Sequence, residues 1–299
     1  MLAADASRTI DLGGYTHYLD LAGPDDVPPL VCVHGLGGSH VNWTAVAPDL
    51  ADRQRVYVPD LAGHGLTFPD RRGTDVDSNQ RLLDRFLREV VGRPVVLMGN
   101  SMGGMISLLQ TARNPETVSG LVLVDPAIPG PIQRLDPSVA RTFATYAVPG
   151  MANALLARRR SRLTPAQQVQ EVLDTCCVDT DRVPRDLIDR QVALATRRQT
   201  VGGVDGAYIN AARSVMLHLV RRTGILAAMR AVEVPVLLLQ GDRDRLVPVE
   251  AAHAAAAAYP EWDVRIAKGV GHVPQMEAPD WTVQQVREWV DAAGVLGRG

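Results

Sequence analysis

A single serine lies between two glycines at the end of a short apolar run. Residues 97–104 read LMGNSMGG, in which Gly99 and Gly103 flank Ser101 in the pattern G-x-S-x-G. Glycines at these two positions let the chain turn sharply from a strand into a helix, which lifts the serine oxygen out of the sheet. A serine hydroxyl displayed in this way is a candidate nucleophile for acyl transfer.

The segments on either side of Ser101 fit such a turn. Val95 to Met98 form a short apolar run typical of a buried parallel strand, and Met102 to Arg113 carry apolar residues at helical spacing. The pattern G-x-S-x-G alone also occurs in ordinary loops. Strand, turn and helix together are the context that the nucleophile motif requires.

A catalytic serine needs a base, and position favours one of the seven histidines. His272 follows the strand-like residues 264–266 and precedes a helix that we expect to begin near Asp280. His34 and His64 also follow apolar runs, but each is embedded among glycines and precedes Ser101. We therefore interpret His272 as the base and the other two as structural loop residues.

The acid that orients the base has three candidates, each of which follows a strand-like run. They are Asp125, Asp242 and Asp244. Aspartates at the ends of strands are also common turn and capping residues. Asp242 comes directly after Gly241, where it suits a turn, whereas Asp244 lies further along the loop and can reach a histidine on the next loop. The pattern favours Asp244 and leaves Asp125 and Asp242 as alternatives.

Two stretches of backbone are candidates for the oxyanion hole. Residues 33–38 read VHGLGG, a glycine-rich turn after an apolar run, and Met102 begins the helix expected after Ser101. Backbone N–H groups in both places can point at a developing negative charge. The glycines match neither G-x-G-x-x-G nor G-x-x-x-x-G-K-[ST], which argues against a phosphate-binding loop.

The elements that must position these residues read as an α/β fold. Arg8 to Leu21 alternate apolar and polar residues around Gly13 and Gly14, which predicts a β-hairpin. Short apolar runs separated by helical spacing then predict a parallel sheet covered on both faces. These runs are residues 30–33, 56–58, 95–98, 121–124 and 236–239.

The alternation of strand and helix stops between residues 131 and 230. Only helix signals remain there, including Thr164 and Gln167 as a capping box around a proline. We expect a core of residues 1–130 and 231–299 with an inserted helical segment at 131–230. This segment has 15 arginines against 8 acidic residues, a net charge of +7. Solvated helix faces are the simpler explanation of that charge, and an anionic substrate or membrane surface is the alternative.

Composition narrows the class of protein further. A chain of 299 residues that is 46% hydrophobic can bury one large core, and a net charge of −2 with 4% aromatic residues argues against nucleic-acid binding. The first residues do not resemble a secretory signal, and no apolar run reaches the ~18 residues of a membrane span, so we expect a cytoplasmic protein. The three cysteines form no spaced ligand set, so no metal is expected.

Five motifs in a fixed order together resemble the α/β-hydrolase family over nearly the whole chain. They are HGLGG at 34–38, PDLAGHG at 59–65, GNSMGG at 99–104, GDRDRLVP at 241–248 and GVGHVPQMEAPD at 269–280. The resemblance implies a mostly parallel sheet with helices on both faces, a helical cap formed by the inserted segment, and chemistry that needs no cofactor or metal.

The resemblance also assigns roles to single residues. It implies that Ser101 is the nucleophile, His272 the base and Asp244 the acid, and that Leu36 and Met102 supply the oxyanion-hole N–H groups. Relatives that open epoxides or remove halide use an aspartate nucleophile, which the serine in this position excludes.

The reaction that the resemblance favours is hydrolysis of an ester of a small to medium apolar acyl group. Asn100 within GNSMGG is similar to the C–C bond hydrolases of meta-cleavage-type keto acids, whose substrate carboxylates Arg190 is a candidate to bind. Those enzymes, however, usually carry Gly-Pro-Gly after the first His-Gly and a tryptophan after the catalytic histidine, where this chain has Leu36-Gly37-Gly38 and Val273. A ligand-binding protein with a vestigial triad is the third alternative.

The expected partner is a small-molecule substrate. The sequence carries no information on the oligomeric state. The side chains expected to line its pocket come from the turn that carries Ser101, the loop that carries His272 and the inserted segment. They are Asn100, Phe143, Tyr146, Met151, Tyr208 and Val273.

Overall fold

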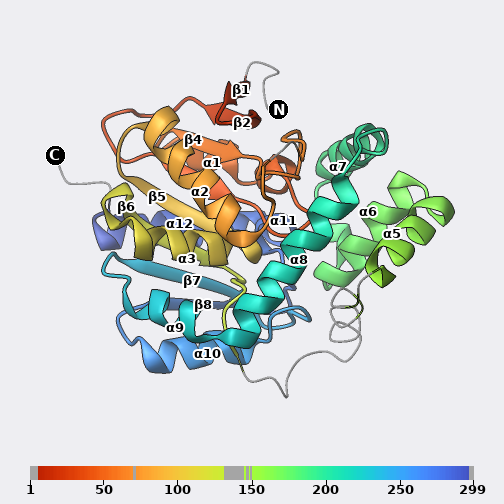
Figure 1. Ribbon diagram of the computed structural model, residues 1–299. Helices are drawn as coiled ribbons and strands as arrows, with labels where there is room; N and C mark the ends of the chain where they lie inside the picture. The colour runs from red at the N-terminus through yellow and green to blue at the C-terminus, as the bar shows by residue number, and fades with distance from the viewer. Residues whose placement is uncertain (1–5, 70–71, 131–144, 146–147, 149, 296–299) are drawn as a thin grey trace.

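The computed structural model describes residues 6–69, 72–130, 145, 148 and 150–295 and contains an eight-stranded sheet (Figure 1). The strands lie in the order β1-β2-β4-β3-β5-β6-β7-β8, and all neighbours from β4 to β8 are parallel. Their bounds are β1 Ser7–Asp11, β2 Tyr15–Leu21, β3 Leu30–Val33, β4 Val56–Pro59, β5 Val95–Asn100, β6 Val118–Val124, β7 Val236–Gly241 and β8 Asp263–Ala267. The predicted α/β fold with a mostly parallel sheet is confirmed.

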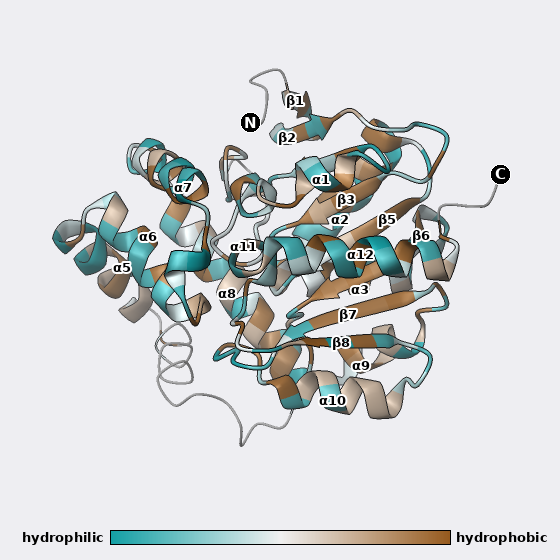
Figure 2. Ribbon diagram, turned by 180° about the vertical axis from the view of Figure 1, so that it is seen from behind, coloured by the Kyte–Doolittle hydropathy of each residue, from teal (hydrophilic) through white to brown (hydrophobic). Residues whose placement is uncertain are grey.

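Helices cover both faces of the sheet, which is why its central strands are continuously apolar. Along β5, Val95 and Leu97 pack on one side, and Val96 and Met98 on the other. The first side is covered by α2 (Val76–Phe86), α3 (Met102–Arg113), α9 (Thr223–Arg230) and α10 (Val249–Ala258). The second side is covered by α1 (Ala47–Ala51) and by α12 (Pro279–Ala293), which Figure 2 shows lying along the sheet.

The predicted hairpin is present as β1 and β2, which pair in antiparallel register from Ser7 with Leu19 to Asp11 with Tyr15. Its turn contains Gly13 and Gly14 at φ 78° and 135°. These are backbone conformations that side chains rarely adopt, so the turn depends on glycine.

Of the described helices between β6 and β7, α5, α6 and α7 lie beyond one end of the strands, and α8 crosses in front of the sheet in Figure 1; we call α5 to α8 the inserted helices (Figures 1 and 2). Their bounds are α5 Met151–Arg162, α6 Pro165–Cys176, α7 Arg185–Arg198 and α8 Val204–Arg221. The predicted capping box starts α6, where Thr164 Oγ1 accepts from the Gln167 N–H and the Gln167 side chain accepts from the Thr164 N–H.

The last helix of the predicted inserted segment lies on the core. Ile225, Ala228 and Met229 of α9 pack in the same cluster as α3. The predicted inserted segment, which ends at residue 230, therefore includes one helix that covers the sheet. None of the described helices combines the length and the apolar character needed to cross a membrane.

The remaining short helical segments connect these elements. They are η2 His40–Trp43, η3 Leu87–Val91, η4 Pro115–Thr117, η6 Thr180–Arg182 and α11 Pro274–Glu277.

Candidate active site

Ser101 occupies a strained turn between β5 and α3. Its φ of 55° and ψ of −117° are unusual for a residue with a side chain. Three backbone hydrogen bonds hold the turn, because the Ser101 N–H donates to Val124 and its carbonyl accepts from Met105 and Ala127, each at 3.0 Å. The sharp strand-to-helix turn that the G-x-S-x-G pattern predicts is therefore present.

The two flanking glycines are required by close approaches of the backbone. A Cβ atom on Gly99 would lie 2.4 Å from the Gly103 carbonyl oxygen, and one on Gly103 would lie 2.2 Å from the Val33 carbonyl oxygen. Any side chain at these positions would push α3 away from β5 and β3. The glycines thus set the position of the serine.

His272 and Asp244 form a buried pair at the ends of β8 and β7. The His272 Nδ1 atom lies 2.7 Å from Asp244 Oδ2, and the two side chains are 5% and 0% exposed. Asp244 Oδ1 accepts from the backbone N–H groups of Leu246 and Val247 at 2.7 and 3.0 Å, which fixes the carboxylate. A proton held at Nδ1 by the carboxylate leaves Nε2 as the basic nitrogen.

The predicted oxyanion donors border Ser101. A Cβ atom on Gly35 would lie 3.1 Å from the Ser101 Cβ, so the glycine-rich turn abuts the serine. That turn is closed by the Gly38 N–H and the Gly35 carbonyl, a bond that does not use the N–H of Leu36. Met102 is the first residue of α3, where N–H groups have no partner within the helix. Their role in binding an oxyanion stays a prediction.

Asn100 has a positional task in the structure. Its side chain is buried, and Nδ2 donates to the carbonyl oxygens of Val124 at 3.0 Å and His272 at 3.1 Å. The amide therefore ties the histidine loop to β6 beside the serine turn. Its predicted place in the substrate pocket is a separate matter that stays a prediction.

Two of the other predicted pocket residues lie at or beside the loops that carry the candidate catalytic residues. Tyr208 of α8 faces the glycine-rich turn at residues 34–38, which we call the oxyanion turn after its predicted role, because a Cβ atom on Gly37 would lie 3.1 Å from the tyrosine ring. Val273 is buried against α6 and η2. Met151, at the start of α5, is 52% exposed. Phe143 and Tyr146 lie outside the described residues.

The three candidate acids have separate places in the structure. Asp244 holds His272, whereas Asp242 Oδ1 accepts from the Gly269 N–H at 2.7 Å, as a turn residue does. Asp125 is fully buried beside Asp244, and its Oδ1 accepts from the Gly241 N–H at 2.9 Å. Burial, and then the charge of Asp244, raise the pKa of Asp125 well above its usual value.

Gln240 links the two carboxyl groups, and sequence reasoning missed it. Its Nε2 lies 2.8 Å from Asp125 Oδ1 and 3.1 Å from Asp244 Oδ2. The only signal in the sequence is a polar residue that continues the apolar run Val236 to Leu239.

Glu277 is a second residue that sequence reasoning missed, and it joins the histidine loop to the inserted helices. Its buried carboxylate accepts from the N–H of Gly271 at 2.8 Å, Val178 at 3.0 Å and Asp179 at 2.9 Å. Close by, the backbone N–H of His272 donates to the Cys176 carbonyl oxygen at the end of α6, at 2.6 Å. The signal was an acidic residue within the motif that follows His272.

His34 and His64 lie in loops beneath the inserted helices. His34 Nδ1 donates to the Gly35 carbonyl at 2.8 Å, and its Nε2 accepts from the Leu61 N–H at 3.0 Å. His64 Nδ1 donates to the Ala62 carbonyl at 3.1 Å. Burial lowers the pKa of His34 and lowers the pKa of His64 to about 3, so both are neutral.

Among the described residues, two groups of side chains have the atoms to hold a metal, and each group contains hydrogen bonds between a histidine ring and a carboxylate. The first group is Asp125, Asp244 and His272; the second is His17, His40 and Asp60. In the second, both Nδ1 atoms lie 2.8 Å from Asp60 Oδ2. Burial alone would raise the pKa of Asp60, but the neighbouring histidines lower it below its usual value.

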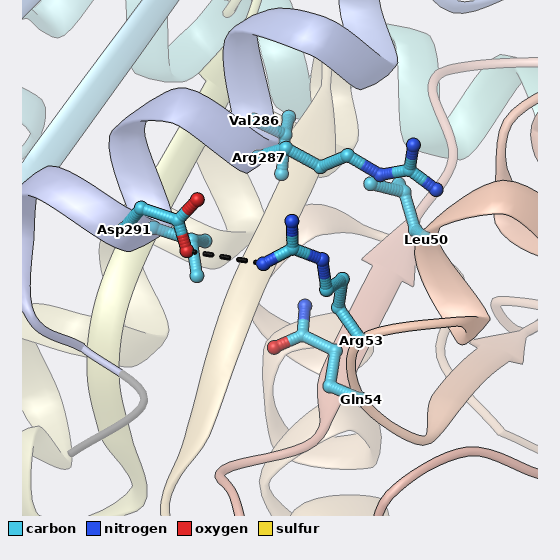
Figure 3. Close-up of a pocket in the computed structure, with 7 residues that line it drawn as sticks. Leu50, Arg53, Gln54, Val286, Arg287 and Asp291 are labelled. Carbon is cyan, nitrogen blue, oxygen red and sulfur yellow. Dashed lines mark hydrogen bonds and ion pairs between the residues drawn. The ribbon is translucent and has the colours of Figure 1, made fainter. Parts of the chain in front are cut away.

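A pocket between α1 and α12 lies outside this site (Figure 3). Arg53 and Asp291 form an ion pair across it at 3.3 Å, and Gln54 and Arg287 are among the other lining residues. None of the lining residues comes from the loops that carry Ser101, Asp244 or His272.

A doubly covered parallel sheet with a serine turn and a buried Asp–His pair at the strand ends is the architecture of the α/β hydrolases. The family model described as the alpha/beta hydrolase family matches residues 30–285. The chain therefore belongs to the α/β-hydrolase family.

Similar proteins include several named for ester hydrolysis. The chain is 26% identical to the uncharacterized carboxylesterase nap of Bacillus subtilis over 288 residues, covering 95% of this chain and 86% of the relative. It is 25% identical to Lipase 1 of Psychrobacter immobilis over 262 residues, covering 87% and 75% of the two chains. Among solved structures, a membrane phospholipase A described as a bacterial virulence factor aligns with a TM-score of 0.74 at 27% identity, over 96% of this chain and 86% of the other.

Proposed function

We propose that this protein is a serine hydrolase that cleaves carboxylic esters of small to medium apolar acyl groups. The observation that carries the proposal is the buried hydrogen bond of 2.7 Å between His272 Nδ1 and Asp244 Oδ2, in a chain whose Ser101 sits on a strained turn. The names of the carboxylesterase and lipase relatives support an ester as the substrate.

The proposed cycle has two halves. Ser101 Oγ attacks the ester carbonyl while His272 Nε2 takes its proton, and the N–H groups of Leu36 and Met102 bind the oxyanion. The C–O bond then breaks, and His272 returns the proton to the leaving alcohol. A water activated by His272 next hydrolyses the acyl-enzyme, which releases the acid and restores Ser101.

An apolar acyl group fits the residues next to the oxyanion turn. Leu36 in that turn packs against an apolar cluster of α5 and α8 that consists of Ala152, Ile209 and Ala212. A second apolar cluster, formed by α6, α7 and η2, contains Val273 directly after the histidine. Both sides of the proposed reaction centre therefore offer apolar contacts.

The two features that favour a C–C bond hydrolase have other uses in the structure. The Asn100 amide binds the carbonyls of Val124 and His272. Arg190 forms an ion pair with Asp186 on α7 at 3.6 Å. Ester hydrolysis therefore remains the first proposal.

A fluorophosphonate probe tests the proposal without knowledge of the substrate. We expect peptide mass spectrometry to place one adduct, on Ser101, and His272→Ala to abolish most labelling. His253→Ala on α10, an exposed histidine, is the matched control and should label like the wild type. An adduct elsewhere, or none on folded protein, would remove the assignment of the nucleophile.

A panel of p-nitrophenyl esters of graded acyl length, with one meta-cleavage-type keto acid, tests the reaction. Release of the chromophore from the esters supports the proposal, and turnover of the keto acid alone supports the C–C bond hydrolase. No turnover of any member by protein that the probe does label would favour a ligand-binding protein with a vestigial triad.

A further inference from the structure

Two carboxyl groups share one buried space behind His272. Asp125 and Asp244 follow the neighbouring strands β6 and β7, and atoms of these two carboxyls and of the His272 ring lie within 4.8 Å of one another. The reaction proposed above uses only one of the carboxyls. The carboxyl of Asp125 has no part in that reaction.

The hydrogen bonds around the pair are unequal. Both oxygens of Asp244 accept hydrogen bonds, because the N–H groups of Leu246 and Val247 donate to Oδ1 while His272 Nδ1 and Gln240 Nε2 donate to Oδ2. Asp125 Oδ1 also has donors, but its Oδ2 is buried and no donor among the described residues reaches it.

The group next to Asp125 is another carboxyl, because atoms of the Asp125 and Asp244 carboxyls lie within 4.8 Å of each other. Ionised carboxylates only accept hydrogen bonds, so a hydrogen bond between the two requires a proton on one of them. Asp244 has donors on both oxygens, which stabilise its ionised form. The oxygen without a donor belongs to Asp125, and the proton therefore belongs there.

We propose that Asp125 is a positioning residue that carries a proton on Oδ2 and donates it as a hydrogen bond to Asp244, so that His272 faces one negative charge instead of two. The inference rests on the proposed function, because it assigns Asp125 to the base of that reaction. Two like charges this close in a buried site would not both ionise, as in other carboxyl pairs that share one proton.

The consequence for His272 is electrostatic. A second negative charge would stabilise the imidazolium, and His272 would then stay protonated to higher pH and be unable to take the proton of Ser101. The other titratable groups near Asp125 are Glu277, which carries hydrogen bonds from three backbone N–H groups, and Cys176. Burial raises the pKa of the Cys176 thiol to about 12, so it adds no charge at neutral pH.

Asp125→Asn and Asp125→Ala test the proposal when fluorophosphonate labelling is measured against pH. The asparagine amide can donate where the acid did, and asparagine tolerates the φ of 43° at this position. We expect Asp125→Asn to label a few-fold more slowly than the wild type, because an amide is a weaker donor, with an unchanged pH midpoint. Asp125→Ala removes the donor and should label about tenfold more slowly, with its midpoint raised, because Asp244 then attracts the imidazolium proton more strongly.

An ionised Asp125 predicts the opposite sign. Both substitutions would then remove a negative charge near His272 and lower the midpoint by about one unit or more, which would overturn the proposal. Infrared difference spectra at pH 7 give a readout without activity. We expect a protonated carboxylic acid band in the wild type that is absent in Asp125→Asn, and a missing band in the wild type would also overturn the proposal.

The infrared test still applies if Asp125→Ala does not fold. It also separates the two proposals. Wild-type protein that fails to label at Ser101 while showing the acid band would contradict the proposed function and leave the shared proton in place.

Discussion

The sheet and the inserted helices are built from different kinds of residues. Every residue of β5 and β7 is buried, and in Figure 2 the strands are predominantly hydrophobic whereas α5, α6 and α7 are largely hydrophilic. The surfaces of these helices carry ion pairs such as Arg159 with Glu171 and Arg160 with Asp205. Burial of apolar area therefore stabilises the core, whereas the inserted helices bury fewer apolar side chains and are joined to the core by small apolar clusters and by a few polar contacts.

Those polar contacts fall on the loops that surround the candidate site. The end of α6 is bound by Glu277 and the His272 N–H. Arg198, at the end of α7, donates to the carbonyls of Gly63 and Gly65. These contacts join the inserted helices to the core next to the proposed reaction centre. Substitutions of the residues that make them should therefore affect both stability and turnover.

The largest effect is expected in the core, at Asp244. Replacement of a triad aspartate by asparagine leaves the histidine in the wrong tautomer and lowered kcat by roughly 10⁴ in the serine-protease case, so Asp244→Asn should lose ester turnover on that scale with a near-wild-type melting temperature. Asp242→Asn on the same loop is the control and should cost mainly stability, because Asp242 bonds the Gly269 N–H. A larger loss in Asp125→Asn than in Asp244→Asn would transfer the role of acid to Asp125.

Glu277→Gln should give the next largest effect, because it weakens the joint between the two regions. Glutamine replaces one accepting oxygen with an NH₂ group that faces backbone donors. Displacement of the histidine loop by about 1 Å is enough to cost up to ~10²-fold in kcat, so a fall of between ten- and a hundredfold is expected. Glu288→Gln on α12, whose carboxylate is exposed, is the matched control. Unchanged kcat with a lower melting temperature would make Glu277 a purely structural residue.

How far the sequence predicts these features differs between the two regions. Parallel strands covered on both faces need continuous apolar runs, so the runs ending at Met98 and Leu239 predict β5 and β7 directly. Ser101 and His272 follow from local patterns at the ends of such strands. The meeting of Asp125 with Asp244, and of Glu277 with α6, depends on strand order and loop conformation, which bring residues distant in the chain together. Local periodicity carries no information about such contacts.

His64 should make stability depend on pH at the loops beneath the inserted helices. Burial lowers its pKa from 6.5 to about 3, so the unfolded chain binds a proton more readily than the folded protein. Its contribution to the free energy of unfolding is therefore fully present above pH 6.5 and declines as the pH falls toward 3. At pH 5 the free energy of unfolding should be lower by about 2 kcal/mol from this residue. Urea unfolding measures the fall in unfolding free energy between pH 7 and pH 5. This fall should be smaller for His64→Asn than for the wild type, and the exposed control His253→Asn should show the same fall as the wild type. Equal losses in all three proteins would contradict the assignment.

Arg198→Ala should lower stability by about 1–3 kcal/mol, because it leaves two carbonyls without their charged donor. Arg197 is exposed on the same turn of α7, and Arg197→Ala is the matched control, with an expected change within ~0.5 kcal/mol. Chemical denaturation measures both. If the two variants unfold alike, this contact does not hold α7 to the core.

The smallest effect is expected on acyl-chain selectivity, where two predicted pocket residues of the inserted helices can be compared. Tyr208 faces Gly37 in the oxyanion turn, whereas Met151 is 52% exposed. If the inserted helices select the substrate, Tyr208→Leu should change the ratio of kcat/KM between short and medium acyl esters by roughly 10-fold, the effect of one or two methylene contacts. Met151→Ala should change the same ratio less, because less of its surface is in contact with protein. A uniform loss across the panel for Tyr208→Leu would mean that the tyrosine stabilises the joint between α8 and the oxyanion turn without selecting the acyl group, since uniform changes in kcat/KM do not discriminate between substrates.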